Sequence, residues 1–187
     1  LDDGLQDKSL NYDISIACFN SSDLIGNGLI IPAGPLRERI SNISNYDIAF
    51  LNGERINNKF EKRLKQLNPN LKIFRARYVP KNLKSFKYKE SFLMFSGIGN
   101  PAEFNKTLNK YNFNIKKVIT FPDHYKYKNS DITEIKKIAR SNKLKIITSE
   151  KDYCRLSKSQ KKNIQYLKIE LKIEKENDFK NFLLKNL

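Results

Sequence analysis

The chain has 187 residues, of which 39% are hydrophobic and 30% charged, enough for a packed core in one medium domain or two small ones, so disorder is excluded as the default. Lysine and arginine number 36 against 20 acidic residues, and the net charge of +16 favours phosphates and anionic membrane surfaces, although an even spread of lysine, asparagine and isoleucine also fits general compositional drift. No apolar run approaches the roughly 18–20 residues of a spanning helix and no signal-peptide pattern opens the sequence, so we expect a soluble or surface-bound protein.

Short apolar runs recur along the chain with helical patterns between them. Most are continuous rather than alternating, which is typical of strands buried on both faces of a parallel sheet. The alternation of strands and helices predicts an α/β fold with a doubly wound, mostly parallel sheet. The predicted strands are Tyr12–Phe19, Tyr46–Leu51, Leu71–Val79, Ser91–Ser96, Ile115–Phe121, Leu144–Thr148 and Ile164–Leu171.

Helix signals fill the gaps between these runs. Asn100-Pro101-Ala102-Glu103 combines an N-cap residue, a proline at the first helical position and a glutamate at the third. Asp131-Ile132-Thr133-Glu134 resembles a capping box, and Phe179, Phe182 and Leu183 form an apolar stripe typical of a helix packed on a core. The stretch Val79–Lys89 is polar, lysine-rich and weakly patterned, so we place a domain boundary there, between residues 1–88 and 89–187.

The two cysteines, Cys18 and Cys154, lie inside apolar or helical patterns. They show neither a C-x-x-C spacing nor a pairing with histidine that would hold a metal. We interpret both as reduced core residues of a cytosolic-type protein.

Two segments of the first half are candidate binding sites for a metal ion or an anion. Asp2-Asp3-Gly4 would lie at the carboxyl end of a strand if apolar residues precede it, where an acidic pair holds Mg²⁺ beside a phosphate; a solvated turn is the alternative. Farther on, "GNGLIIPAGPLRERI" (26–40) predicts a helix with Arg37 and Glu38 in its first turn. Free backbone N–H groups and a guanidinium would converge there on an anion, although a well-capped helix explains the pattern equally.

In the second half, "FSGIGNPAEF" (95–104) formally matches the dinucleotide-binding fingerprint G-x-G-x-x-G/A through Gly97, Gly99 and Ala102. Pro101 weakens this reading, because it removes an N–H donor that would face a pyrophosphate. A nucleic-acid-binding module is a third reading, based on charge and tyrosines alone. Because no RRM, KH or OB-type motif is present, we expect no nucleic-acid partner.

The only histidine, His124, follows a predicted strand and the residues Phe121, Pro122 and Asp123. A histidine at the carboxyl end of a strand is placed where α/β folds carry their chemistry. Asp123 and nearby tyrosines are able to orient the imidazole. The alternative is a surface-loop histidine without a role.

Taken together, these strings resemble the tetraacyldisaccharide 4′-kinase family, the lipid A 4′-kinases, over nearly the whole chain. The motifs are "DDGLQ" (2–6), "GNGLIIPAGPLRE" (26–38), "SGIGNPAEF" (96–104), "FPDHY" (121–125) and "TSEKD" (148–152). The resemblance implies a P-loop NTPase-like kinase of lipid A and lipopolysaccharide biosynthesis. It would transfer phosphate from ATP, with Mg²⁺, to the 4′-hydroxyl of a tetraacyl glucosamine disaccharide, as a peripheral protein at the cytoplasmic face of the bacterial inner membrane.

The resemblance also assigns roles to residues. It implies that residues 1–88 are the later part of the nucleotide and substrate domain, with an extended linker, and that residues 89–187 are a smaller α/β domain. His124, with its neighbour Asp123, would support a catalytic aspartate. The implied substrate- and nucleotide-binding residues are Asp2, Asp3, Gln6, Arg37 and Glu38, with Asp3 as the metal ligand.

Three departures from the family pattern matter. Position 5 is leucine where phenylalanine is usual, and Asp7 stands where the family has histidine, which removes a donor or cation from substrate binding. The glycine-lysine P-loop and the catalytic aspartate belong to the N-terminal portion of the family. We therefore expect these 187 residues to be inactive alone, with the N-terminal portion as a partner if it is supplied separately.

Overall fold

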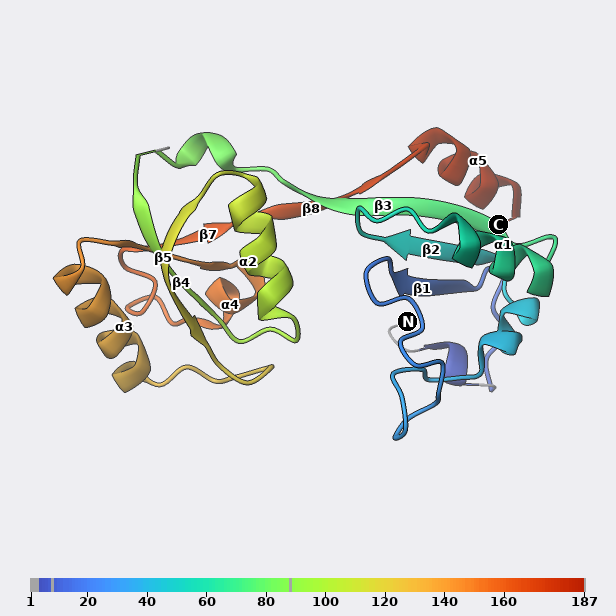
Figure 1. Ribbon diagram of the computed structural model, residues 1–187, viewed down its shortest axis with the longest axis horizontal. Coiled ribbons are helices and arrows are strands. Elements are labelled where there is room, and N and C mark those ends of the chain that lie inside the picture. Colours follow the sequence, from blue (N-terminus) through green and yellow to red (C-terminus); the bar gives the residue numbers. More distant parts are fainter. Residues whose placement is uncertain (1–3, 8, 88, 187) are drawn as a thin grey trace. The chain divides into compact units, whose positions relative to one another are not determined.

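The structure is a computed structural model that describes residues 4–7, 9–87 and 89–186 (Figure 1). The chain forms two compact units. Unit 1 consists of Leu1–Val79 and Leu171–Leu187, and unit 2 of Pro80–Glu170. Each unit contains a four-stranded sheet.

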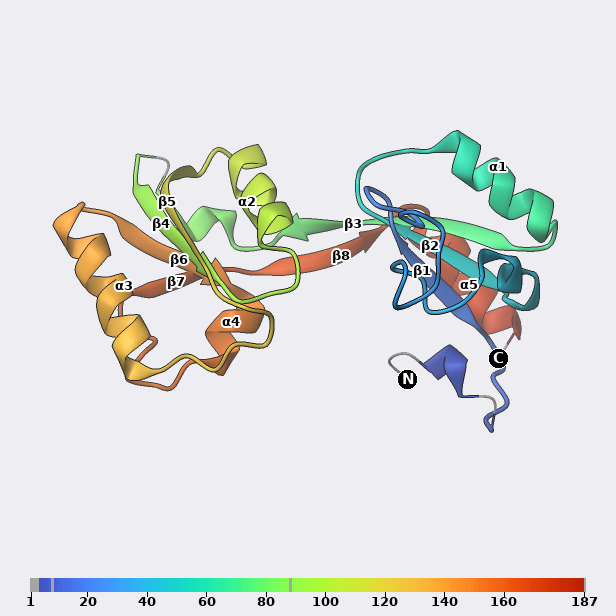
Figure 2. The same ribbon diagram turned by 60° about the horizontal axis from the view of Figure 1, so that its bottom comes forward.

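The sheet of unit 1 has the strand order β1-β2-β3-β8, in which β1, β2 and β3 run parallel. Helix α1 (Asn58–Leu67) covers one face and α5 (Glu176–Asn186) covers the other (Figure 2). Strand β2 is apolar from Ile48 to Leu51, and these four residues are buried between the two helices. The strands are β1 (Ile16–Asn20), β2 (Ile48–Asn52), β3 (Lys72–Pro80) and β8 (Ile169–Ile173).

The last helix belongs to unit 1, which differs from the expected boundary between residues 88 and 89. Its stripe packs on the sheet face that β2 and β3 share, where the ring centroid of Phe179 lies 5.4 Å from Phe50 and 5.1 Å from Phe74. Burial of these rings holds α5 on the sheet of unit 1, although the residues that precede Leu171 in the sequence, Pro80–Glu170, form unit 2. The division of the chain follows this long-range packing, which the polar stretch at Val79–Lys89 does not reveal.

The sheet of unit 2 has the order β5-β4-β6-β7 with all neighbours parallel. Its strands are β4 (Ser91–Ser96), β5 (Asn114–Thr120), β6 (Lys145–Ser149) and β7 (Ile164–Leu167). Its helices are α2 (Pro101–Lys110), α3 (Asn129–Ser141) and α4 (Glu150–Arg155). The chain steps from β4 outward to β5 and then returns to β6 on the other side of β4. The carboxyl ends of β4 and β6 therefore flank a topological switch point, where open α/β sheets bind their ligands.

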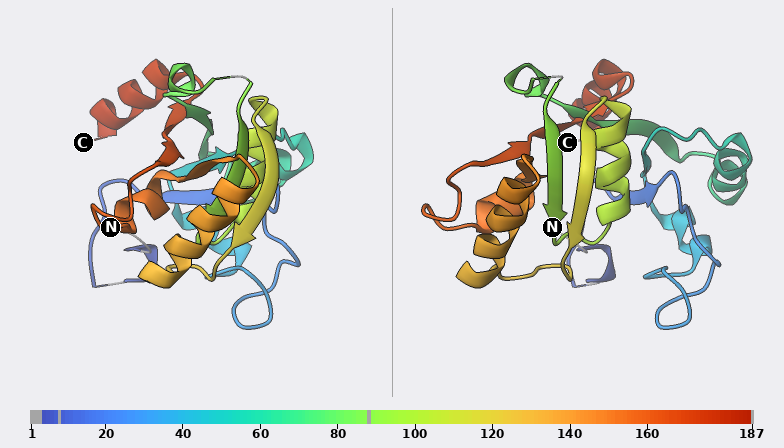
Figure 3. Two further views of the ribbon diagram at one scale, coloured as in Figure 1. Left: turned by 90° about the vertical axis from the view of Figure 1, so that its left-hand side faces the viewer. Right: turned by 60° about the vertical axis from the view of Figure 1, so that its left-hand side comes forward.

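Strand β4 is the centre of unit 2 and is buried on both faces. Phe92 and Met94 pack in the core beneath α2, whereas Leu93 and Phe95 pack in the core beneath α3. Figure 3 shows the two helices on opposite sides of β4 and β5. The prediction that continuous apolar runs form doubly covered parallel strands is confirmed here.

Several predicted boundaries need correction. The run Ile164–Leu171 forms two strands, β7 and β8, which belong to different sheets. Helix α2 begins as predicted, with the Asn100 side chain accepting from the Glu103 N–H. Helix α3 begins earlier than predicted, and Asp131 lies in its first turn, where Oδ2 accepts from the Lys128 N–H at 2.8 Å.

Short 3₁₀ helices complete the description at η1 (Gly4–Gln6), η2 (Ile40–Asn45) and η3 (Leu83–Ser85). Cys18 and Cys154 are both unpaired and exposed, so the prediction of two core cysteines is wrong. In the three described ranges, no helix combines the length and the apolar character needed to cross a membrane.

Candidate functional site

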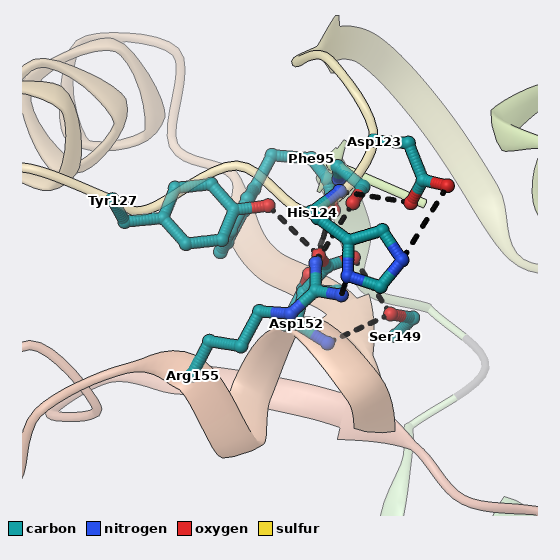
Figure 4. A network of polar contacts seen from close by, with 9 residues as sticks. Phe95, Asp123, His124, Tyr127, Ser149, Asp152 and Arg155 are labelled. Carbon is teal, nitrogen blue, oxygen red and sulfur yellow. Dashed lines mark hydrogen bonds and ion pairs between the residues drawn. The ribbon is translucent and has the colours of Figure 1, made fainter. Parts of the chain in front are cut away.

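Polar side chains converge at the switch point of unit 2 (Figure 4). They come from the loop after β4, the loop after β5 and helix α4, three segments that the parallel sheet brings to one edge. Asp123 and His124, two of the predicted residues, lie in this group.

The centre of the group is Asp152, whose side chain is completely buried. Its Oδ1 accepts from the Gly97 N–H at 3.2 Å and from the Tyr127 hydroxyl at 3.0 Å. Arg155 Nη1 lies 3.3 Å from the same oxygen, and the Ser149 hydroxyl donates to Oδ2 at 2.6 Å. A buried carboxylate with four hydrogen-bond donors is well compensated, and it ties the loops after β4 and β5 to helix α4.

Tyr127 remains a hydrogen-bond donor to this carboxylate. Burial raises the pKa of its phenol well above the ordinary value, and the charge of Asp152 and the hydrogen bond to it raise that pKa further. The nearby Arg155 opposes the shift without reversing it. The phenol therefore stays protonated over the physiological pH range.

Arg155 connects the buried carboxylate to the imidazole. Its Nη1 also donates to the Gly97 carbonyl at 2.9 Å, and its Nη2 lies 3.3 Å from His124 Nδ1. A guanidinium only donates, so Nδ1 must accept, and the neutral ring then carries its proton on Nε2. Arg155 thereby selects one of the two tautomers of His124.

The backbone of His124 lies in the left-handed region, with φ at 58°. Asp123 Oδ1 accepts from the His124 N–H at 2.8 Å, and the Tyr125 N–H donates to the Pro122 carbonyl at 3.2 Å, which closes a tight turn. A non-glycine residue in this region is uncommon and costs about 1–2 kcal/mol. The turn leaves the imidazole 73% exposed, with Nε2 3.8 Å from Asp123 Oδ2, too far for a hydrogen bond.

The glycine-rich turn after β4 makes close contacts with other residues of unit 2. The Gly97 N–H is taken by Asp152, and a Cβ at Gly97 would lie 3.0 Å from both the Pro122 carbonyl and the Tyr127 hydroxyl. A Cβ at Gly99 would lie 3.2 Å from the Asp123 carboxylate. Glycine is needed here so that the loop after β5 packs closely, and the carboxylates oppose a pyrophosphate at this turn.

A cavity of about 550 Å³ lies in unit 1. Arg37 and Glu38 line it, and so do Gly4 and Leu5, which follow the predicted acidic pair in the sequence. Two motifs that are far apart in the chain therefore meet at one cavity within unit 1. Its wall also includes apolar side chains of β1 and its approach, such as Ile16.

The prediction of a helix with Arg37 and Glu38 in its first turn is wrong. Arg37 and Glu38 precede the 3₁₀ helix η2, so no α-helical N-terminus faces an anion at these residues. Glu38 Oε2 instead accepts from Asn42 Nδ2 and from the Tyr46 hydroxyl, both at 2.8 Å. Burial, followed by this contact with Glu38, raises the pKa of Tyr46 to about 12.

The remaining predicted residues are placed only in part. Asp2 and Asp3 lie outside the described residues, and Gln6 is the last residue of η1. Over the three described ranges, no group of three histidine, cysteine or acidic side chains is arranged to hold a metal ion.

Sequence reasoning missed the roles of Asp152 and Arg155. Ser149 is the N-cap of α4, and its hydroxyl also accepts from the Asp152 N–H at 3.1 Å. Arg155 follows Asp152 by three residues, the spacing of an ion pair on one helix face, and this was the available signal.

The sequence matches known proteins along its whole length. The profile of the family described as tetraacyldisaccharide-1-P 4′-kinase matches residues 1–187. The tetraacyldisaccharide 4′-kinase of Pelagibacter ubique is 42% identical over 185 residues, which is 98% of this chain and 59% of the relative. That of Rickettsia canadensis is 36% identical over 180 residues, covering 95% of this chain and 53% of the relative. The chain thus spans somewhat more than half the length of these relatives.

A solved structure is similar in fold. The crystal structure of the "apo" form of LpxK from Aquifex aeolicus in complex with ATP superposes with a TM-score of 0.67 at 22% identity, covering 100% of this chain and 56% of that one. The parallel α/β architecture and the P-loop NTPase-like fold class predicted from the sequence are confirmed. The family profile covers the whole chain and the Pelagibacter ubique relative is 42% identical over 98% of it, so the chain belongs to the tetraacyldisaccharide 4′-kinase family.

Proposed function

We propose that this chain supplies the acceptor side of a kinase that phosphorylates the 4′-hydroxyl of a tetraacyl disaccharide with ATP, in lipid A biosynthesis. The family match carries the proposal. The geometry of unit 2 supports it, because the imidazole of His124 lies at the switch point of the sheet with its tautomer set by Arg155.

The chemistry follows the requirements of phosphoryl transfer. The 4′-hydroxyl oxygen attacks the γ-phosphorus, the bond to the bridging oxygen of ADP breaks, and the hydroxyl proton passes to a carboxylate outside this sequence. His124 Nε2–H donates to that carboxylate and orients it, while Nδ1 remains fixed by the Arg155 guanidinium. Asp123 contributes by holding the turn in which His124 lies.

The remaining site residues are proposed for binding. Arg37 is suited to a phosphate of the disaccharide, because it is exposed at the rim of the unit 1 cavity. Gly4 and Leu5 line the same cavity; in the sequence, Asp2 and Asp3 precede them and Gln6 follows them. The carboxylate of Asp3 is a hard oxygen donor of the kind Mg²⁺ prefers, and the ion would neutralise charge on the phosphate oxygens.

We further place the protein at the cytoplasmic face of the inner membrane, where a four-chain lipid substrate resides. The net charge of +16 is suited to an anionic surface. The N-terminal portion of the family, which carries the P-loop, is the proposed partner in catalysis. The competing dinucleotide-binding function is disfavoured, because Asp152 already occupies the Gly97 N–H that would face a pyrophosphate.

Activity is tested by joining the chain to the part of the Pelagibacter ubique relative that the match leaves uncovered. We expect this fusion to transfer radioactive phosphate from γ-labelled ATP to a tetraacyl disaccharide 1-phosphate, and the chain alone to transfer none. A fusion that is folded and binds ATP, but leaves the disaccharide unmodified, contradicts the proposal.

A further inference from the structure

The segment between β1 and η2 carries a run of exposed apolar residues. Leu29, Ile30 and Ile31 are 52%, 37% and 51% exposed, and Pro32 and Ala33 are exposed as well. Single exposed apolar side chains are normal in soluble proteins, whereas five successive apolar residues make an interaction surface. We call residues 29–33 the apolar tip; it lies in the blue loop at the lower edge of unit 1 in Figure 1.

The apolar tip is an ordered turn. The Leu36 N–H donates to the Leu29 carbonyl at 3.1 Å, and the Asn27 side chain accepts from the Leu29 N–H at 3.1 Å while donating to the Ala33 carbonyl at 2.8 Å. A Cβ at Gly34 would lie 2.2 Å from Asn27 Oδ1, so glycine is needed for this closure. The hydrogen bonds of the turn thus fix the backbone in a conformation that leaves the aliphatic side chains exposed.

The surroundings of the apolar tip fit an anionic lipid surface. Arg37 and Arg39 follow the turn and are both exposed, and the chain as a whole carries a net charge of +16. Aliphatic side chains beside arginines combine the two attractions that hold a protein at a bilayer, apolar burial and charge. A protein partner of neutral or basic surface would lack the second attraction.

We propose that the apolar tip inserts into the boundary between headgroups and acyl chains of an anionic bilayer, with Arg37 and Arg39 at the level of the lipid phosphates. The inference rests on the proposed function, in which the substrate has four acyl chains and stays in the membrane. It identifies the element that brings the unit 1 cavity to the bilayer, since Arg37 and Arg39 also line that cavity.

Tryptophan fluorescence tests the insertion directly, because the chain contains no tryptophan of its own. Ile31→Trp places the probe in the apolar tip, and Ile56→Trp places it at a site of similar exposure, 58%, elsewhere in unit 1. With vesicles of phosphatidylglycerol and phosphatidylcholine, we expect the emission of Ile31→Trp to shift to the blue and to be quenched by brominated acyl chains. The emission of Ile56→Trp should stay unchanged.

Vesicle sedimentation measures the strength of the attachment. We expect Ile31→Asp to weaken binding to the same vesicles about tenfold or more, and Ile56→Asp to leave it unchanged. Absence of vesicle binding by the unsubstituted chain, or binding that leaves both tryptophans in water, would overturn the inference. A blue shift that depends on protein concentration and not on lipid would indicate self-association instead and would also overturn it. No ATP or disaccharide is present, so the result is independent of kinase activity.

Discussion

At the scale of single residues, Asp152 and Arg155 determine the state of His124. The buried Asp152 carboxylate anchors the guanidinium, and the guanidinium donates toward His124 Nδ1. The position of His124 could be predicted from the sequence, because this histidine is unique and follows an apolar run. The tautomer of its ring could not be predicted, because Arg155 lies 31 residues away and is brought close only by the parallel sheet.

The tautomer of His124 is the first prediction. Since the chain has one histidine, the long-range ¹H–¹⁵N spectrum of the imidazole is unambiguous. In the neutral ring, we expect the proton on Nε2 and an unprotonated Nδ1. Arg155→Met should move both nitrogen signals toward the values of interconverting tautomers, and Arg140→Met, the same change on α3, should not. A wild-type spectrum of interconverting tautomers would refute the assignment.

The second prediction concerns Tyr127, whose pKa is raised chiefly by burial. Below about pH 10, the ordinary tyrosine pKa, the phenol is protonated in both folded and unfolded chains. Above it, the unfolded chain loses a proton that the folded chain retains, so stability falls as pH rises. Between about pH 10 and 11 we expect the free energy of unfolding to fall up to ~1.4 kcal/mol more for wild type than for Tyr127→Phe. Urea unfolding at both pH values measures this difference, and parallel slopes would contradict it.

At the scale of elements, the continuous apolar runs predict the strands well, because a strand that is buried on both faces needs consecutive apolar residues, and a short stretch of sequence shows them. The break within Ile164–Leu171 has no such local signal in the sequence. Lys168 N–H donates to Asn82 Oδ1, and the Lys168 carbonyl accepts from the Lys81 N–H, so partners more than eighty residues away separate β7 from β8. The helix predicted with Arg37 and Glu38 in its first turn does not form. The Leu36 N–H donates to the Leu29 carbonyl and the Ile31 N–H to the Leu36 carbonyl, so the residues just before Arg37 close a turn.

The third prediction tests the assignment of α5 to unit 1. Phe179→Ala removes a ring that contacts Phe50 and Phe74, and we expect it to destabilise β2 and β3 by about 2–3 kcal/mol. Amide hydrogen exchange should show faster opening in those strands and unchanged protection in β4 and β6. Leu184→Ala, at a side chain 78% exposed on the same helix, should change stability by less than about 0.5 kcal/mol. Lost protection centred on unit 2 would contradict the division.

At the scale of the whole molecule, we propose that each unit carries one binding surface of a lipid kinase. Unit 1 has a cavity that joins the first two motifs, and unit 2 has an imidazole held at its sheet switch point. The family could be predicted from the sequence because five motifs occur in the expected order, whereas any one of these motifs alone is too unspecific to identify a family. They could not reveal which side chains hold the motifs in place, since those contacts are made in three dimensions.

The most direct test of this account is the turnover number of the fusion with the Pelagibacter ubique portion, compared with its His124→Asn variant. Asparagine tolerates the left-handed backbone of position 124, so the turn is preserved while the imidazole is lost. We expect kcat to fall by about 100-fold or more, with the melting temperature and the KM for ATP nearly unchanged. A variant that phosphorylates the tetraacyl disaccharide at the wild-type rate would contradict the account.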